Sequence, residues 1–128
     1  MSTKAEDLLE LAGEQARRVG EPWRRSAISR AYYASFHRCL AWERGLARRG
    51  QVVKPQGGVH QGLIDRLGAP NDACTSKQKR QSVDLHRLLS RQKDQRVIAD
   101  YRLRRSVSEI DLKKQLSDAR LLFKTCGS

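Results

Sequence analysis

Cysteine, proline and long apolar runs are scarce in this sequence, and their scarcity excludes several classes of protein. The three cysteines, Cys39, Cys74 and Cys126, are odd in number and have no C-x-x-C spacing, which argues against a disulfide framework or a zinc site and fits a reducing cytoplasm. No apolar run approaches the roughly 20 residues of a membrane span. The polar start "MSTKAEDLLE" is unlike a signal peptide. We therefore expect a cytoplasmic protein without a membrane partner.

Several sequence signals of enzymes and of β-structure are also missing. No segment alternates polar and apolar residues for long enough to predict a strand. Gly57 and Gly58 form a loop that no P-loop lysine follows, and no serine has a nucleophile-elbow context. His60 and His86 have no cysteine or carboxylate at ligand spacing, so we expect them to be structural or solvated. The sequence therefore predicts neither a metal nor a cofactor.

Positive charge is abundant. The chain has 26 Lys and Arg against 14 Asp and Glu, a formal net charge of +12. Such an excess favours a polyanionic partner, either a nucleic acid or an acidic protein, although a merely solvated basic surface is the ordinary alternative. Most of the basic residues are arginines in pairs or short clusters, such as Arg102, Arg104 and Arg105. Because the planar guanidinium suits phosphate, we favour nucleic acid.

Helical periodicity predicts an all-α fold, with residues 1–128 in a single domain. A capping box at Thr3 and Glu6 begins the first helix, whose inner face extends to Val19. Four further helices are expected, the third of them short. They cover about 22–49, about 59–67, about 77 to the mid-nineties, and the residues after a cap at Ser108 and Asp111. The expected architecture is a bundle of four long helices plus a short one.

The second predicted helix has two different faces. Tyr32, Phe36 and Trp42 should pack against three leucines of the fourth helix, which are Leu85, Leu88 and Leu89. Arg30, His37 and Arg44 are spaced by seven residues and form a polar stripe, which Arg48 would extend. This stripe is either the solvated side of an amphipathic helix or a site where arginines hold phosphate and His37 is a general base. The spacing leaves both interpretations open.

Two strings carry a resemblance to a known family. "SRAYYASFHRCL" at residues 29–40 and "RVIADY" at residues 96–101 resemble small stand-alone bacterial proteins of the HEPN superfamily, and the likeness covers about residues 24–124. The resemblance implies a helical bundle, often a homodimer, with a role in RNA or nucleotide biology. Many relatives are metal-independent ribonucleases with an arginine and, four to six residues later, a histidine. Others are toxins held by a minimal nucleotidyltransferase antitoxin, which can nucleotidylate a tyrosine after that motif.

The second string departs from the nuclease pattern. Arg96 matches the family's arginine, and Asp100 and Tyr101 match the trailing residues, but Ala99 stands where the nuclease histidine would be. Alanine cannot accept a proton, so two hypotheses remain. The first is an RNA- or nucleotide-binding protein of a toxin–antitoxin or defence system. The second is an active ribonuclease that uses Arg30 and His37. Under both, the arginines that contact nucleic acid would be Arg44, Arg48, Arg96, Arg102, Arg104 and Arg105.

Overall fold

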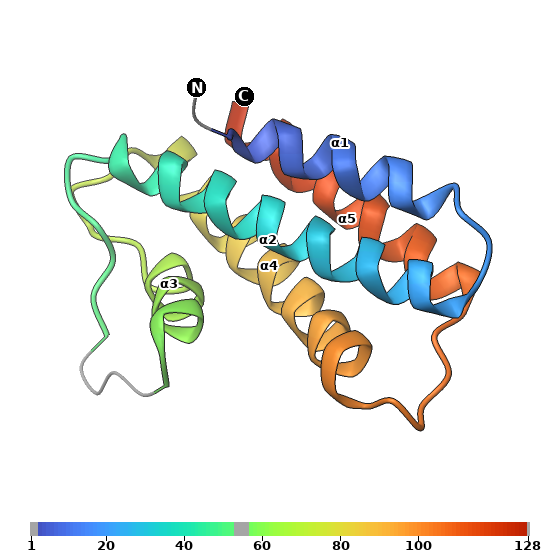
Figure 1. The fold of residues 1–128 in the computed structure, drawn as a ribbon. Helices are drawn as coiled ribbons and strands as arrows, with labels where there is room; N and C mark the ends of the chain where they lie inside the picture. Colours follow the sequence, from blue (N-terminus) through green and yellow to red (C-terminus); the bar gives the residue numbers. More distant parts are fainter. Residues whose placement is uncertain (1–2, 53–56, 128) are drawn as a thin grey trace.

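The computed structural model describes residues 3–52 and 57–127, and in these ranges it contains helices and no strand. The five helices are α1 (Ala5–Ala16), α2 (Glu21–Arg44), α3 (Val59–Leu67), α4 (Ser76–Tyr101) and α5 (Glu109–Gly127) (Figure 1). Four are long and α3 is short. The prediction of an all-helical bundle of this composition is therefore confirmed.

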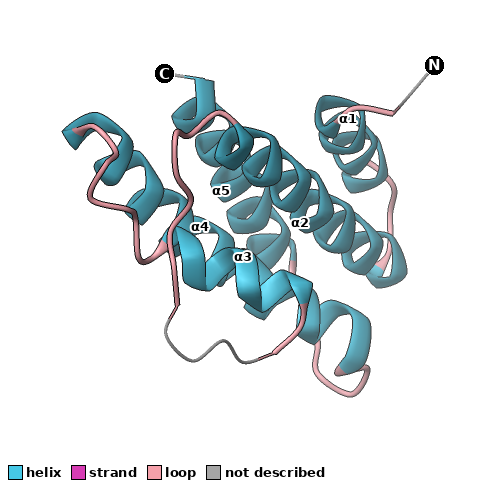
Figure 2. Cartoon of the chain, turned by 90° about the vertical axis from the view of Figure 1, so that its left-hand side faces the viewer, coloured by secondary structure: helices cyan, strands magenta, loops and turns pink. Residues whose placement is uncertain are grey.

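Helix α2 is the centre of the bundle and packs against α1, α4 and α5. Figure 2 shows α2 and α5 between α1 on one side and α4 on the other, with α3 on the side of α4. The α4–α5 connection lies at the end of the bundle where α2 begins (Figure 1). This arrangement brings residues of α2, α3 and α4 together on a face away from α1.

The core contains the apolar surfaces that the sequence predicts. Tyr32 and Phe36 of α2 lie in one cluster with Leu85, Leu88 and Leu89 of α4, and the half-buried Trp42 packs against its edge. A second cluster, nearer the start of α2, is rich in small residues from α1, α2, α4 and α5. It includes Ala12, Ala27, Ile28, Ala31, Ala99, Leu116 and Ala119. Small side chains at these contacts let the helix axes approach one another closely.

Helix α3 is attached to the long helices by polar contacts as well as by its leucines. The buried Glu43 of α2 accepts two hydrogen bonds from Arg66, at 2.8 and 2.9 Å, which is the bidentate geometry of a strong pair. The hydrogen bond to Glu43 raises the pKa of Arg66 although burial opposes its charge. On α4, Ser82 Oγ donates to the carbonyl of Leu67, and His86 Nδ1 lies 2.7 Å from the carbonyl oxygen of Ile64. These contacts fix the position of α3, and His86 is structural as expected.

Four predicted helix ends are wrong, and one cap is confirmed. Helix α1 begins one residue later than predicted, because the Lys4 amide donates to Asp7 at 2.8 Å in place of a Thr3–Glu6 capping box. Val19 lies beyond α1 and is 96% exposed. Helix α2 ends at Arg44, where Gly45 caps it, and α4 continues to Tyr101. The predicted cap of α5 is present, with Ser108 and Asp111 exchanging hydrogen bonds of 3.0 and 3.1 Å.

Candidate nucleic-acid interface

Arg96 of α4 lies at the centre of a cluster of aromatic rings. Its guanidinium carbon is 5.2 Å from the ring centre of Tyr33, 5.9 Å from that of Tyr32 and 5.4 Å from that of Tyr101. It donates a 2.7 Å hydrogen bond from Nη2 to the Tyr33 hydroxyl. Arg30 also lies over the Tyr33 ring, with its guanidinium carbon 5.7 Å from the ring centre. Arg30 and Arg96 thus contact the same tyrosine at distances typical of cation–π attraction.

Asp100 holds Arg96 in this place. Asp100 Oδ2 lies 2.9 Å from Arg96 Nε and accepts a 3.1 Å hydrogen bond from the buried Ser29. Arg96 Nε–H nevertheless has no hydrogen-bond partner, so the contact with Asp100 is an ion pair without a well-aimed N–H bond. Burial opposes the charge of Arg96, but Tyr33, Tyr101 and Asp100 together raise its pKa. Arg96 therefore remains cationic and is a fixed part of the cluster.

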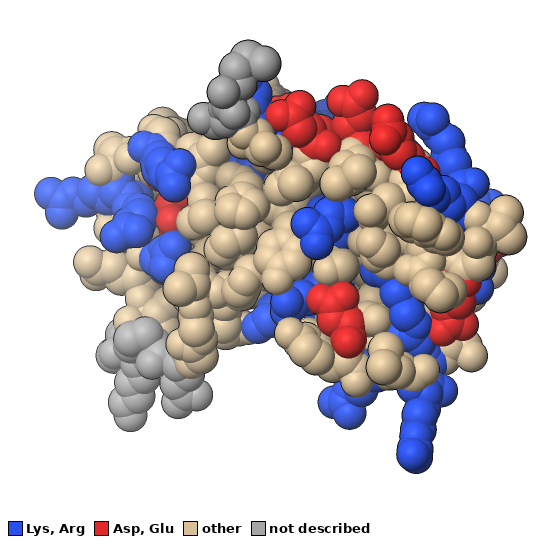
Figure 3. Space-filling model, in the orientation of Figure 1, with Lys and Arg blue, Asp and Glu red and all other residues tan. Residues whose placement is uncertain are grey.

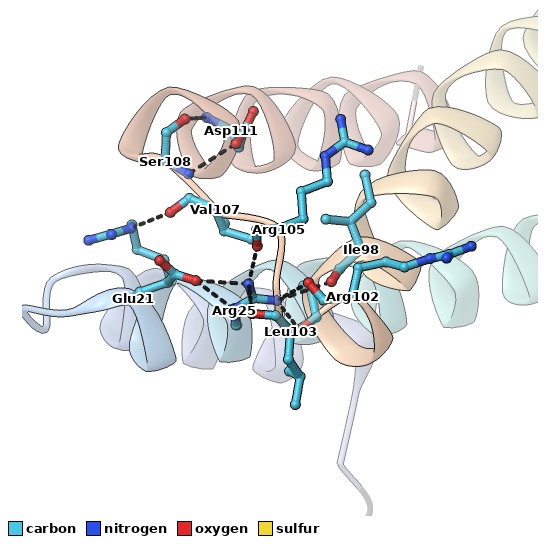
Figure 4. Close-up of polar contacts among 11 residues, drawn as sticks. Glu21, Arg25, Ile98, Arg102, Leu103, Arg105, Val107, Ser108 and Asp111 are labelled. Carbon is cyan, nitrogen blue, oxygen red and sulfur yellow. Dashed lines mark hydrogen bonds and ion pairs between the residues drawn. The ribbon is translucent and has the colours of Figure 1, made fainter.

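The arginine loop, residues 102–105, continues from the end of α4 and is held from beneath by Arg25 of α2 (Figure 4). Arg25 Nη1 donates to the carbonyls of Ile98 at 3.1 Å and Ala99 at 3.0 Å. Further contacts of its two Nη atoms reach the carbonyl oxygens of Arg102, Leu103 and Arg105. Glu21 pairs with the same guanidinium at 2.8 Å. Because the loop's carbonyls turn inward to Arg25, the side chains of Arg102, Arg104 and Arg105 are left exposed.

Tyr101 lies between the Arg96 cluster and the arginine loop, and it is 66% exposed. The structure therefore brings Arg30 and Arg96, from "SRAYY" and "RVIADY", to the same tyrosine, and places the three loop arginines directly after Tyr101. The sequence analysis singled out Arg30, Arg96, Tyr101 and the loop arginines of this surface, but neither Tyr33 nor Arg25, which organises the loop. In the sequence, Arg25 is marked only by its neighbour Arg24, with which it forms one of several arginine pairs.

His60 of α3 belongs to the same neighbourhood, which the sequence did not reveal. Its Nδ1 lies 2.8 Å from the hydroxyl of the buried Tyr32, and its ring centre is 4.3 Å from that of Phe36. Burial is the main cause that lowers the pKa of His60, and the positive charges of Arg96, Lys93 and His37 lower it further. His60 is structural, as expected, but it is also a neutral imidazole near the Arg96 cluster. Its 28-residue separation from Tyr32 hid this contact.

His37 and Arg44 lie apart from the arginine loop. Both are exposed on α2 and line a groove of about 580 Å³ between the start of α1 and the second half of α2. Arg38 and Lys4 line the same groove. The stripe of Arg30, His37 and Arg44 is thus present on α2, but Arg48 does not extend it, because the helix has already ended at Arg44. Arg48 instead lies on the connection after α2, where its carbonyl accepts a contact from the Cys74 thiol.

Ala99 does not face the candidate interface. It is 2% exposed and packs in the second core cluster beside Ala27 and Ala31. A histidine at position 99 would have to enter this core cluster. It could not present its imidazole to the candidate interface unless the core repacked.

The chain matches none of the known proteins compared with it, and its described residues contain neither a metal-binding group nor a membrane-spanning helix. No family model, curated protein or solved structure matches the chain. Within residues 3–52 and 57–127, no three His, Cys, Asp or Glu residues are grouped so that they could hold a metal ion. None of the helices described is long and apolar enough to cross a membrane.

Proposed function

We propose that this protein binds RNA or a nucleotide through the interface formed by Arg30, Tyr33, Arg96, Tyr101 and the arginine loop. The observation that carries the proposal is the exposed Tyr101 ring between a fixed guanidinium and a loop that presents three arginines. Single-stranded nucleic acid is bound by this combination, because bases stack on aromatic rings and arginines contact the phosphates. The net charge of +12 would attract such a ligand from solution.

The resemblance to HEPN proteins supports a place for this binding in a bacterial toxin–antitoxin or defence system in the cytoplasm. Under that proposal the chain is a homodimer, and a minimal nucleotidyltransferase is its antitoxin. Tyr101 is exposed enough to be a substrate for such a partner. The assignment of Arg44 and Arg48 to RNA contact is kept as a weaker part of the proposal, because neither residue adjoins the arginine loop.

Charge reversal of the loop tests the proposal. Arg104→Glu with Arg105→Glu should weaken binding of a fluorescent single-stranded RNA by at least about tenfold in an anisotropy titration, because two phosphate contacts become repulsive. The matched control is Lys77→Glu with Arg80→Glu, which changes the net charge equally at the exposed start of α4. Equal losses in both variants would show that only net charge matters and would contradict a specific interface.

A metal-independent ribonuclease is the second candidate function. The observation that favours it is the imidazole of His60 beside the Arg96 cluster, together with an exposed histidine on α2. His37 is exposed on the helix of Arg30, and His60 is held by Tyr32. If the protein cleaves RNA through Arg30 and His37, then His37→Ala should lower the rate about 10²–10⁴-fold, as loss of a general base does, while RNA affinity stays nearly unchanged. An active parent whose rate survives His37→Ala would exclude His37 as the base, and His60→Ala would then be compared.

A further inference from the structure

A basic groove lies beside α1, at the end of the bundle where α2 begins. It has a volume of about 460 Å³ and is bordered by the end of α1, the start of α2 and the first half of α5. Five cationic side chains and a single carboxylate, that of Glu109, line it. The cations are Arg17, Arg18, Arg24, Lys113 and Arg120. Only Arg24 is occupied by a hydrogen bond, to the carbonyl of Val107 at 2.9 Å.

The floor of this basic groove is apolar. Ala16, Val19, Leu112 and Leu116 contribute to it, and no aromatic side chain is among its lining residues. A nucleic acid strand would satisfy the cations but would leave this apolar floor uncovered. A flat lipid surface could not enter a concave groove. A helix with carboxylates and an apolar side chain would satisfy both the floor and the cations, which is the usual way that helices bind in grooves.

The same chain carries such a helix. Within α1 every charged residue is acidic and exposed, and these are Glu6, Asp7, Glu10 and Glu14. Each of the other helices contains Lys or Arg. Figure 3 shows the acidic side chains gathered along the upper edge, over α1, with basic side chains at the right-hand end of that edge. Leu11, near the middle of α1, is 39% exposed.

We propose that the basic groove is the docking site for α1 of a second copy of this chain, so that two copies pair through antiparallel α1 helices. The acidic first half of one α1 would lie against the basic groove at the end of the other, and the reverse pair would form on the other side of the two-fold axis. Glu6 and Arg17 are about 16 Å apart along the helix axis, at 1.5 Å per residue. The contact is self-complementary, as a two-fold interface must be.

One detail near the middle of α1 favours this arrangement. A two-fold axis between the acidic and basic ends passes close to Gly13, which lines the groove. At Gly13 an added Cβ would meet no atom within 4 Å, so this position is open and lets a second backbone approach. The arrangement also overcomes the repulsion expected between two copies of charge +12, because each acidic helix faces the cations of its partner.

This inference rests on the homodimer of the proposed function but not on RNA binding. A charge swap tests it with two double variants. Lys113→Glu with Arg120→Glu leaves three cations and three carboxylates in the groove, and Glu10→Lys with Glu14→Lys leaves two acidic and two basic residues in α1; all four side chains are exposed, so both variants should fold. Each variant alone removes the charge attraction from both contacts of the dimer and should raise the dimer dissociation constant at least about tenfold in analytical ultracentrifugation. An equimolar mixture should form heterodimers, because the unaltered acidic α1 of the groove variant meets the unaltered basic groove of the α1 variant.

The outcomes separate this inference from the proposals on which it rests. Lys77→Glu with Arg80→Glu, the control of equal charge change outside the groove, should leave the dimer intact. A wild-type protein that is monomeric at high concentration would overturn both the dimer and this interface, but not RNA binding. A dimer that neither swap weakens would overturn the interface alone. If the groove variant loses RNA affinity while its dimer persists, the groove is an RNA site and the proposal is wrong.

Discussion

Arg25 shows how much one side chain can organise at the scale of the residue. It contacts five backbone carbonyls at the end of α4 and in the arginine loop, and its side chain is 11% exposed. Without it those inward-facing carbonyls, and Glu21, would lose a charged donor. Lysine keeps the positive charge but has a single nitrogen, which cannot span the same set of acceptors.

Arg25→Lys should therefore lower the free energy of unfolding by about 2 kcal/mol, the scale of hydrogen bonds to a charged group. Urea unfolding measures this loss. Arg24→Lys is the neighbouring control, because Arg24 makes one hydrogen bond, to Val107, and the effect of its change should be smaller. Equal losses at the two positions would mean that the carbonyl contacts of Arg25 add little.

His60 gives a second prediction at this scale, through pH. Burial and three nearby cations hold its pKa in the folded protein below the ordinary value of 6.5. As the pH falls below 6.5, His60 binds a proton in the unfolded chain but not yet in the folded protein. The free energy of unfolding therefore decreases with falling pH. The contribution is complete above about pH 6.5 and is lost as the pH falls from there toward the lowered pKa. The urea-unfolding midpoint, measured from pH 7.5 to 5, should decrease with falling pH, and His60→Gln should reduce the slope of this decrease. His37→Gln should reduce it less, because His37 is only the smallest of the three charges that act on His60. A wild-type slope in the His60 variant would contradict the assignment.

At the scale of the element, the packing of α4 was predictable because its apolar residues repeat with the helical period. Leu88 is 1% exposed in the main core cluster. Leu88→Ala should cost about 2–5 kcal/mol, since it removes buried methyl groups and leaves a cavity. Val83, on the same helix but 45% exposed, is the control, and Val83→Ala should cost about 0.5 kcal/mol or less. Similar losses in urea unfolding would show that the buried face of α4 is misassigned.

The elements also show where prediction from sequence ended. Periodicity identified the five helices and the Tyr32–Leu88 core, because these depend on spacing within one helix. The family resemblance pointed to Arg96 and Tyr101, and the clustering of arginines pointed to the arginine loop. Periodicity placed the end of α2 five residues too late, since Leu46 continues the apolar pattern although Gly45 caps the helix. It also missed the contacts of Arg25 with the arginine loop and of His60 with Tyr32. These join residues far apart in sequence, and no local pattern encodes them.

At the scale of the whole molecule, the acidic helix α1 and the Arg96 cluster of α2 and α4 lie apart, because α1 and α4 are on opposite sides of the bundle. Dimerisation through α1 is therefore compatible with an open Arg96 cluster in each copy. Two such interfaces on one dimer would let a single RNA strand engage both, which raises its apparent affinity without new contacts.

The salt dependence of RNA affinity is the measurement that belongs to this scale. Each phosphate that an arginine neutralises releases counterions, so the logarithm of the binding constant falls linearly with the logarithm of the salt concentration. If about six phosphates are contacted, the affinity for single-stranded RNA should fall about 300-fold between about 50 and 200 mM salt. Arg104→Glu with Arg105→Glu should make this slope shallower, because fewer phosphates remain paired. Binding that ignores salt, or a slope that the loop variant leaves unaltered, would show that the arginine loop does not contact the RNA backbone.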